Sequence, residues 1–519
     1  MLEAWWRRAR AAGNRLLARF GLDRYMLLDR IARKDNTIAH LFGLLCFYLG
    51  ISLMIPCFVA SYYDEDVKPW LYPILLAMAI GVPLLLRYKS AERARPTEAM
   101  FVVAMAWLVA MVFGAIPFVL YGLGMLDAMF ESMSGFTTTG SSILADTESW
   151  PKSLLFWRSL SQWLGGAGII MIFVAVLPML GVGGRVLAKR ESPGMEIAPL
   201  SLRIQEEVRK FAVIFIVLSG LQLLLLLLTG IGIYDSFAVM FSTMSTGGFS
   251  PHSQSIAYYG SPAVEWIVIV FMFLGGTSFY LHFHAITSKD WRLYWHNSEF
   301  RAYSFLTIAA TAIIFALLWD QSFEDMEASL RTSLFQVISV FTTTGFATTD
   351  FILWDKAAVF LLFALMFIGA CSGSTAGGIK TIRFILAKGF ITSVLYKAVH
   401  PRAMYSVKLD GRSVGESTMS SLLAVVICYL ATVIVSTVAL VLIGIDPTTS
   451  MSAAIATLSN EGPALGSLGP MGNFGALPDP AKIILIFNMW AGRLEFISVF
   501  VILTRPFWKE LLRYRKPGE

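Results

Sequence analysis

The sequence predicts an all-α polytopic membrane protein with two N-terminal spans and four span–pore-helix–filter–span repeats around one pore. Three observations predict this fold. The chain is 56% hydrophobic and 15% charged, whereas soluble proteins carry about 25% charged residues. Ten apolar segments approach or exceed the length that crosses a bilayer, about 20 residues. Finally, four short polar stretches that end in glycine interrupt the apolar sequence at similar intervals.

The ten apolar segments alternate with connections of different charge. The segments are residues 36–61, 70–87, 98–122, 155–180, 207–232, 262–286, 302–320, 356–396, 415–444 and 481–504. Connections rich in Lys and Arg mark the cytoplasmic side of a membrane protein. Every basic connection falls on one side if the chain crosses ten times, so we expect both termini in the cytoplasm. The basic segment 1–35 is expected to lie on the cytoplasmic membrane surface.

Other chemistry receives little support from the sequence. Cys46, Cys57, Cys371 and Cys428 lie scattered in apolar stretches, which favours buried apolar residues over a metal site or disulfides. His282 and His284 are two residues apart, so they do not form the i, i+4 pair of a helical metal site. No nucleotide-binding or nucleophile motif occurs in a suitable context, and we expect no enzyme.

The four polar stretches each follow a run typical of a short helix. The stretches are Thr137–Gly140, Ser245–Gly248, Thr342–Gly345 and Ser459–Gly462, and the runs are 125–136, 234–244, 330–341 and 448–458. These runs are too short to cross the membrane. Irregular backbone at membrane depth is tolerated only inside protein or beside water. We therefore expect four re-entrant half-helices, each followed by a filter strand on the outer side.

This arrangement suits a cation. A half-helix carries about half a negative charge at its C-terminus, and glycine tolerates the positive φ that turns carbonyls toward one axis. Rings of carbonyls replace the water around a dehydrated cation. A hairpin turn or a small-residue helix contact explains one such stretch but not four. The candidate filter residues are Thr138, Thr139, Gly140, Thr246, Gly247, Gly248, Thr343, Thr344, Gly345, Asn460, Glu461 and Gly462.

A second feature interrupts the 356–396 segment, which is too long for one span. Four glycines fall within residues 369–378, and each costs about 1 kcal/mol in a helix relative to alanine. The stretch is either a close helix contact through small residues or a loop that crosses the pore below the filter. The candidate gate residues are Gly369, Gly373, Ser374, Thr375, Gly377, Gly378, Lys380 and Arg493.

Arg493 belongs to this set because it lies inside the last apolar segment. An arginine there costs about 2.5–3.5 kcal/mol. It either snorkels or pairs with a carboxylate such as Glu495, or it stands below the filter as a positive barrier that contacts the loop. Arg158 and Glu265 are further charges in or near spans, and pairing is the expected explanation for both.

Several motifs together resemble the membrane subunit of bacterial Trk-type potassium uptake systems, in the superfamily with the Ktr and plant HKT transporters. The similarity runs over nearly the whole chain. It rests, in order, on Phe136–Gly140, Trp157–Leu160, Gln162–Gly166, Ser245–Ser250, Phe341–Phe346, Gly373–Lys380 and Gly492–Glu495.

The resemblance implies a potassium pathway with one glycine per repeat, at Gly140, Gly248, Gly345 and Gly462. Gly247 competes with Gly248 for the second position, and Gly248 is preferred because Phe249 then matches Phe346. Glycine at all four positions is the potassium-preferring pattern of this superfamily. The resemblance also implies that residues 369–379 form an intramembrane gating loop.

The resemblance further implies K⁺ as the transported ion, held at the filter residues, with no organic cofactor in this chain. The expected partners are a cytoplasmic RCK-type NAD/ATP-binding regulatory subunit, a second copy in a homodimer, and lipids of the bacterial inner membrane; no nucleic acid is expected. The expected units are residues 1–35, 36–97 (two extra helices), 98–184, 185–299, 300–413 and 414–519 (four pore repeats, the last with the cytoplasmic tail).

Glu461 departs from the family, which more often has a small or apolar residue before the fourth glycine. Its carboxylate either attracts cations at the bore or points behind the filter and braces it through hydrogen bonds. Beside the potassium pathway, an ion-coupled K⁺/H⁺ or K⁺/Na⁺ symporter remains an alternative, for which Glu461 is the filter-adjacent candidate. A non-transporting membrane scaffold gives no reason for four filter-like stretches.

Overall fold

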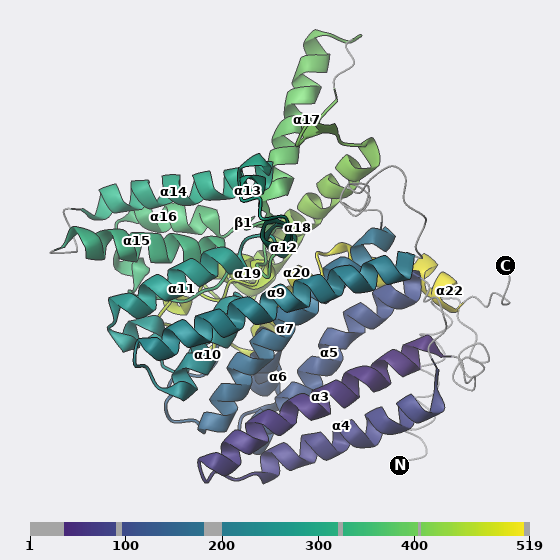
Figure 1. The fold of residues 1–519 in the computed structure, drawn as a ribbon, viewed down its shortest axis with the longest axis vertical. Coiled ribbons are helices and arrows are strands. Elements are labelled where there is room, and N and C mark those ends of the chain that lie inside the picture. Colours follow the sequence, from purple (N-terminus) through teal and green to yellow (C-terminus); the bar gives the residue numbers. More distant parts are fainter. Residues whose placement is uncertain (1–35, 90–95, 181–199, 320–324, 403–405, 513–519) are drawn as a thin grey trace.

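The computed structural model is mostly helical (Figure 1). It describes residues 36–89, 96–180, 200–319, 325–402 and 406–512. The predicted N-terminal surface segment, residues 1–35, therefore lies outside the described residues. The strands within the described part are two residues long. Ile368–Gly369 (β1) pairs in parallel with Ile379–Lys380 (β2), and Lys408–Leu409 (β3) pairs antiparallel with Arg412–Ser413 (β4).

Six described helices are long and apolar enough to cross a membrane, and a bent pair makes a seventh. The six are α3 (Thr37–Tyr62), α4 (Lys68–Arg87), α5 (Pro96–Leu120), α9 (Leu200–Leu228), α14 (Ser298–Leu318) and α18 (Glu416–Leu442). The pair consists of α11 (Pro262–Gly275) and α12 (Phe279–Ser288). Each of these coincides with one of the ten expected segments. A further expected segment, 155–180, is helical as α7 (Lys152–Leu180).

The helices α3 and α4 lie side by side at one edge of the molecule (Figure 1). Glycines bring their backbones together. A Cβ on Gly43 would lie 3.1 Å from the Gly81 carbonyl oxygen, and one on Gly81 would lie 2.8 Å from the Phe47 nitrogen. Small residues let helix backbones approach closely where lipid supplies no hydrophobic drive. This explains why the first two helices form a tight hairpin.

Four shorter helices stand between the longer ones, as the sequence predicts. They are α6 (Met125–Phe136), α10 (Ile233–Met244), α15 (Met326–Phe341) and α19 (Pro447–Ser459). They contain 12, 12, 16 and 13 residues. At about 1.5 Å per residue none reaches the roughly 30 Å of a bilayer core. Each ends at the beginning of one polar stretch.

Three of the expected apolar segments are broken. Segment 356–396 divides into α16 (Lys356–Leu365) and α17 (Thr381–Val399), and the intervening residues form a loop, as its glycines predict. Segment 262–286 was expected to be continuous, but α11 and α12 meet at 94°. The break falls on Gly275, Gly276 and two small polar residues, which disfavour a continuous helix.

The last expected segment, 481–504, is also interrupted rather than continuous. It divides into α20 (Asp479–Arg493) and α21 (Ile497–Ile502), followed by α22 (Arg505–Leu512). Glu495 and Phe496 adopt φ of 55° and 63° between the first two helices. Such left-handed backbone ends a helix, so Arg493 lies at a helix terminus and not within a continuous span.

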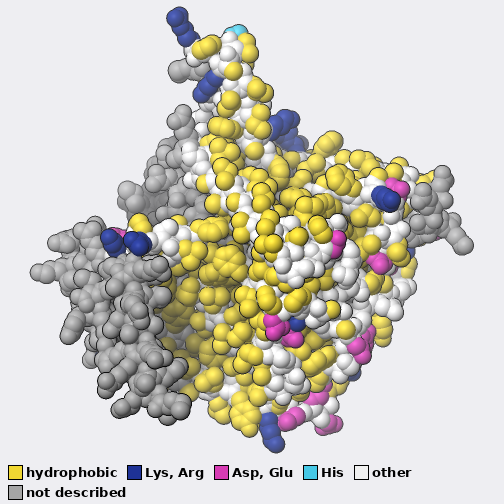
Figure 2. Space-filling model, turned by 180° about the vertical axis from the view of Figure 1, so that it is seen from behind, with side chains coloured by type: hydrophobic (Ala, Val, Ile, Leu, Met, Phe, Trp, Pro, Cys, Tyr) yellow, Lys and Arg dark blue, Asp and Glu magenta, His cyan; other side chains and the backbone are white. Residues whose placement is uncertain are grey.

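Hydrophobic side chains cover much of the molecular face shown in Figure 2. Exposed apolar residues lie along α3, α4, α9 and α18, among them Phe58, Leu75, Ile216 and Ile434. A water-facing surface would not carry so many large apolar side chains, and a lipid-facing surface does. The remaining elements are α13 (Arg292–His296) and the 3₁₀ turns η1 (Ser255–Tyr259), η2 (Phe351–Leu353) and η3 (Gly466–Leu468).

Candidate functional site: four filter stretches and a loop beneath them

The four short helices end in the same way. At each end, one residue with left-handed backbone donates its N–H to the carbonyl three residues earlier. The next residue donates its N–H to the carbonyl five residues before it. In the first stretch these bonds join Thr138 to Gly135 at 3.0 Å and Thr139 to Ser134 at 2.9 Å. This pair of bonds is the Schellman cap, which satisfies carbonyls at a helix terminus. The equivalent left-handed residues are Thr138, Thr246, Thr343 and Asn460, with φ of 53°, 52°, 55° and 54°.

A glycine with positive φ follows two residues after each left-handed residue. These glycines are Gly140, Gly248, Gly345 and Gly462, with φ of 83°, 77°, 79° and 101°. The four filter stretches thus share one backbone conformation although their side chains differ. The structure also separates the two candidates in the second stretch, because Gly248 and not Gly247 has the positive φ.

The four glycines contact one another's stretches in a closed cycle. A Cβ on Gly140 would collide with the carbonyl oxygen of Gly247, and one on Gly248 with that of Thr344. A Cβ on Gly345 would collide with the carbonyl oxygen of Glu461. A Cβ on Gly462 would lie 2.8 Å from the carbonyl oxygen of Thr139, which closes the cycle. Only glycine fits at these positions.

Side-chain hydrogen bonds also support the stretches. Thr137 and Thr139 share a 2.8 Å hydroxyl hydrogen bond, and Thr342 and Thr344 share one of 2.7 Å. In the second stretch the Gln162 side chain takes this role. It donates to the Gly247 carbonyl and accepts from the Phe249 N–H at 3.0 Å.

The fourth stretch is supported differently. Asn460 donates from Nδ2 to Thr139 Oγ1 at 2.9 Å and to the Met489 carbonyl at 3.0 Å, so it links the fourth stretch to the first. Glu461 is 1% exposed, and within the described residues neither carboxylate oxygen has a hydrogen-bond partner. The alternative in which Glu461 braces the filter through side-chain hydrogen bonds is therefore wrong. Asn460 makes the bracing contacts instead.

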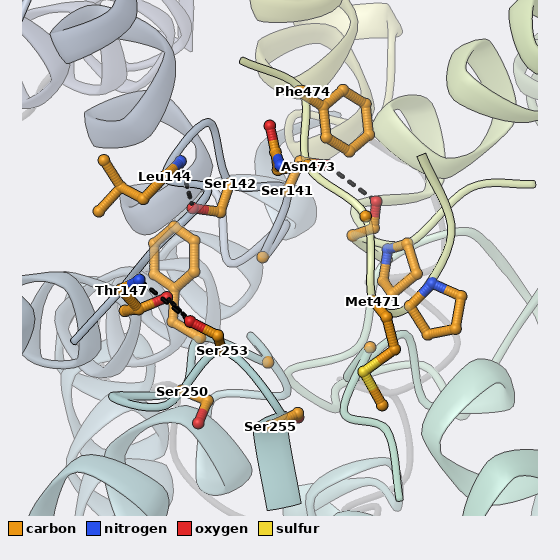
Figure 3. A pocket seen from close by; sticks show the side chains of 18 of the residues that line it. Ser141, Ser142, Leu144, Thr147, Ser250, Ser253, Ser255, Met471, Asn473 and Phe474 are labelled. Carbon is orange, nitrogen blue, oxygen red and sulfur yellow. Dashed lines mark hydrogen bonds between the residues drawn. The ribbon is translucent and has the colours of Figure 1, made fainter. Parts of the chain in front are cut away.

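A pocket of about 110 Å³ lies at the glycine end of the stretches. Serines from different repeats face it (Figure 3). Ser141 donates to the Gly462 carbonyl at 2.9 Å, and Ser253 and Ser255 accept from Thr147 and Ala347. These bonds join connections that are far apart in the sequence, so the pocket walls hold the glycine ends together.

Glu148 supports one wall of this pocket. Partial burial opposes its ionisation, but hydrogen bonds from the hydroxyl and the backbone N–H of Ser253 outweigh that effect and lower the pKa of the carboxyl group. Glu148 therefore remains ionised at neutral pH and holds the Ser253 connection in place.

A buried ion pair lies behind the first two stretches. Arg158 of α7 donates from Nε to Glu131 of α6 at 2.7 Å, and both side chains are almost fully buried. The same guanidinium donates to the Ser250 carbonyl and lies 4.2 Å from the centre of the Phe249 ring. The pairing expected for Arg158 is confirmed. Glu265 is also paired, with Arg331 at 2.7 Å.

The loop between α16 and α17 lies at the other end of the stretches, against their left-handed residues. Thr375 is fully buried, and its hydroxyl lies 3.2 Å from the Thr246 hydroxyl and 3.1 Å from the Met244 carbonyl. Gly377 donates its N–H to Thr343 Oγ1 at 2.7 Å. A Cβ on Gly377 would collide with the Ser459 carbonyl. The loop thus touches the second, third and fourth stretches.

The other expected loop residues have internal roles. Gly373 and Gly378 adopt φ of 73° and 66°, and Gly369 packs against the carbonyl of Gly377 without room for a Cβ. Ser374 donates to the Cys371 carbonyl at 2.6 Å. Lys380, buried, donates from Nζ to the Ala376 carbonyl at 2.5 Å. These contacts give the loop a defined shape.

Arg493 contacts this loop directly. It is 3% exposed and donates to the Thr375 carbonyl at 3.0 Å and to the Gly165 carbonyl at 3.5 Å. The expected alternative, a pair with Glu495, is wrong because Glu495 pairs with Arg383 of α17. No carboxylate within the described residues pairs with Arg493.

Comparisons with known proteins identify the family of this chain. The family model TrkH, described as a cation transport protein, matches residues 73–507. The chain belongs to the TrkH family. It is 35% identical over 484 residues to the Trk system potassium uptake protein TrkH of Salmonella typhimurium, covering 92% of this chain and 99% of that relative. It is 30% identical over 483 residues to TrkG of Escherichia coli K12, covering 91% and 99%.

A solved structure extends the TrkH likeness to the fold. The crystal structure of the potassium transporter TrkH from Vibrio parahaemolyticus matches with a TM-score of 0.84 at 32% identity, and the match covers 91% of this chain and 99% of that one. Membership of the TrkH family and the apolar helices make this chain a multi-pass membrane protein.

Two supporting residues were not among the candidates from the sequence. Gln162 supports the second stretch, in which Gly247 has no side chain that could form a hydrogen bond. Asn488 of α20 accepts from Ser436 at 2.9 Å and donates to Thr457 at 3.4 Å. A polar amide in an otherwise apolar helix is the signal that identifies such residues, since an unpaired amide in lipid is costly.

The buried pair behind the filter predicts a large loss of stability when one partner is removed. Arg158→Met should destabilise the protein by about 3–5 kcal/mol, because it leaves the Glu131 carboxylate buried without its charge partner. Thermal unfolding of the protein in detergent measures this loss. The double variant Arg158→Met/Glu131→Gln should recover part of it, and a double variant as unstable as the sum of the single changes would contradict the charge argument.

Proposed function

We propose that this protein conducts K⁺ into the cell across the bacterial inner membrane, through the four filter stretches. The observation that carries the proposal is the closed cycle of contacts between Gly140, Gly248, Gly345 and Gly462 and the carbonyls of neighbouring stretches. We infer that four backbones of one conformation, arranged in a cycle, turn other carbonyls of their stretches toward a common axis. Such a ring replaces the hydration shell of a cation.

The ends of the four short helices favour a cation at that axis. Their C-termini carry partial negative charge and converge on the filter stretches. The Salmonella and Escherichia relatives are named potassium uptake proteins, which supports K⁺ as the ion. The repeat architecture fits this proposal, with α3 and α4 preceding four units that each contribute one short helix and one filter stretch.

The loop at residues 369–379 is proposed to be the gate of this pathway. Its contacts with Thr246 and Thr343 support this role, because these residues lie at the end of the filter stretches opposite the pocket. Arg493 adds a positive charge at Thr375. A cation that leaves the filter on this side meets both the loop and the charge, so conduction requires that they move.

The control of this gate is proposed to come from outside the chain. We propose a cytoplasmic nucleotide-binding subunit of the RCK type as the regulatory partner, with both termini and the basic connections on its side of the membrane. A homodimer with one pathway in each protomer is part of the same proposal. The basic residues of 380–412 and of the tail are the proposed docking surface.

Alanine substitution at one filter glycine tests the pathway. Gly345→Ala should lower K⁺ flux into proteoliposomes by about tenfold or more, because its Cβ has no room beside the Glu461 carbonyl and its φ is 79°; one tenfold step corresponds to about 1.4 kcal/mol. Gly230→Ala is the matched control, since Gly230 has a φ of 86° but no neighbour within 4 Å of a Cβ. Equal flux losses in both variants would contradict a specific role of the ring.

Removal of the charge beneath the filter tests the barrier. Arg493→Ala should raise basal K⁺ flux by about tenfold or more, because even about 1.4 kcal/mol of repulsion changes a rate tenfold. Arg493→Lys retains the charge and should remain near the native flux. Unchanged flux in the alanine variant, measured on reconstituted protein, would rule out the barrier.

Reversal potentials distinguish a channel from the ion-coupled alternative. In proteoliposomes the potential should follow the K⁺ gradient alone, and a fixed dependence on H⁺ or Na⁺ would indicate a symporter.

Glu461→Gln should lower the K⁺/Na⁺ preference in the same recordings, because it removes a buried carboxylate beside the filter carbonyls. The control Glu265→Gln alters a carboxylate away from the filter. An unchanged preference in Glu461→Gln would exclude a role for this charge.

A further inference from the structure

The break between α11 and α12 is occupied by the intramembrane loop. The turn at residues 275–278 leaves helix-end groups without partners inside their own helices. The carbonyls of Gly276 and Gly275 accept from the N–H groups of Cys371 and Thr375 at 3.0 and 3.3 Å. In the opposite direction, Phe279 donates its N–H to the Gly373 carbonyl at 3.0 Å. The broken span of the second repeat therefore holds the loop of the third.

Glu299 holds the same loop at its neck. It lies in the first turn of α14, and its carboxylate is buried. A single oxygen, Oε1, accepts from the N–H of Ser372 at 2.7 Å and from that of Ile382 at 3.1 Å. Ser372 follows β1 and Ile382 follows β2, and these strands pair in parallel. The carboxylate thus bridges the two sides of the neck, and it also lies at the N-terminus of α17, where negative charge is favourable.

The two holding elements belong to one structural unit. The helices α12 and α14 are joined by α13, and we call residues 275–299, which begin with the α11–α12 break, the corner. His282 of α12 lies 2.7 Å from the Tyr294 hydroxyl of α13 and 2.9 Å from the Leu274 carbonyl of α11. Figure 1 shows α12, α13 and β1 in the same region of the molecule. A displacement of the corner therefore acts on the loop at both the Gly276 break and Glu299.

We propose that Glu299 is a positioning residue for the intramembrane loop, and that the corner is the element through which the loop is moved. This rests on the proposed role of the loop as the gate. The loop has two sets of contacts. Those with the corner hold its neck and the Thr375 N–H, whereas the Thr375 hydroxyl and the Gly377 N–H attach its tip to the filter. Movement of the corner draws the tip from the filter while Glu299 keeps the neck closed.

A native thiol reports the position of the loop without any measurement of ions. Cys371 lies in the loop and is 1% exposed. The other cysteines, Cys46, Cys57 and Cys428, are replaced by alanine so that one thiol remains. The full-length protein is reconstituted in proteoliposomes, and the rate of maleimide labelling at Cys371 is measured by mass spectrometry. K⁺ flux is measured on the same preparations.

Glu299→Ala removes the acceptor and should raise the Cys371 labelling rate and the basal K⁺ flux by about tenfold or more, since hydrogen bonds to a charged group are among the stronger ones. Glu299→Gln retains one oxygen that accepts both N–H groups and should remain close to native labelling. Asp290→Ala removes an exposed carboxylate from the same corner without touching the loop, and it should label at the native rate.

A second variant tests the other contact in case Glu299→Ala does not fold. A Cβ on Gly276 would lie 2.7 Å from Thr342 Cγ2, 2.8 Å from the Tyr303 hydroxyl and 3.2 Å from the Cβ of Ala370. Gly276→Ala should therefore displace the loop and raise labelling as well. Native labelling rates in both variants overturn the proposal. We call the two hydrogen bonds from Ser372 and Ile382 to Glu299 the clasp. An equal rise in the Cys371 labelling rate in Glu299→Ala and Glu299→Gln overturns the clasp.

The two readouts separate this inference from the proposed function. Faster labelling with unchanged flux supports the clasp and contradicts the gate. Native labelling in both Glu299→Ala and Gly276→Ala, together with a raised flux in Arg493→Ala, overturns the clasp and leaves the gate standing.

Discussion

The structure depends on the close approach of four backbones at four glycines. Each glycine lies against the carbonyl of the neighbouring stretch, at a distance that excludes even a methyl group. The positive φ at each position is a second constraint that favours glycine. The Schellman caps set the direction in which the chain enters each stretch, because they end each helix with one left-handed residue. The short helices, the pocket and the loop are all positioned relative to this cycle.

The contacts beneath the filter make its state depend on that of the loop. The left-handed residues Thr246 and Thr343 end their helices and also contact the loop through their hydroxyls. A threonine in left-handed backbone is strained relative to glycine, so a hydroxyl contact is one reason for its presence there. The loop therefore cannot leave without removing hydrogen bonds from two of the four filter stretches.

Much of this site was predictable from the sequence, because its elements are local. Short helices, small polar stretches and a glycine-rich interruption are each encoded within about 15 neighbouring residues, and periodicity identifies them. The partners of the charges were not predictable. Glu495 is two residues from Arg493, yet it pairs with Arg383, which is 112 residues away. Sequence proximity does not determine ion pairs when a chain folds back on itself.

The break at residues 275–278 also escaped prediction, for a different reason. Two glycines in a long apolar run are common in membrane helices, where neighbouring segments satisfy the freed backbone groups. Here the partner that satisfies them is the loop of the third repeat. A break of this kind becomes visible only when both interrupted spans are seen together, since neither one accounts for its own unpaired groups.

The support behind the filter shows which features the four repeats must share. Two repeats use a threonine pair, the second uses Gln162, and the fourth uses Asn460. These side chains differ in size and chemistry, yet the backbone they support has nearly the same φ values throughout. The requirement that the four repeats share is therefore one of backbone shape, which several kinds of support can satisfy. Glu461 takes no part in this support, because Asn460 supplies the hydrogen bonds of the fourth stretch.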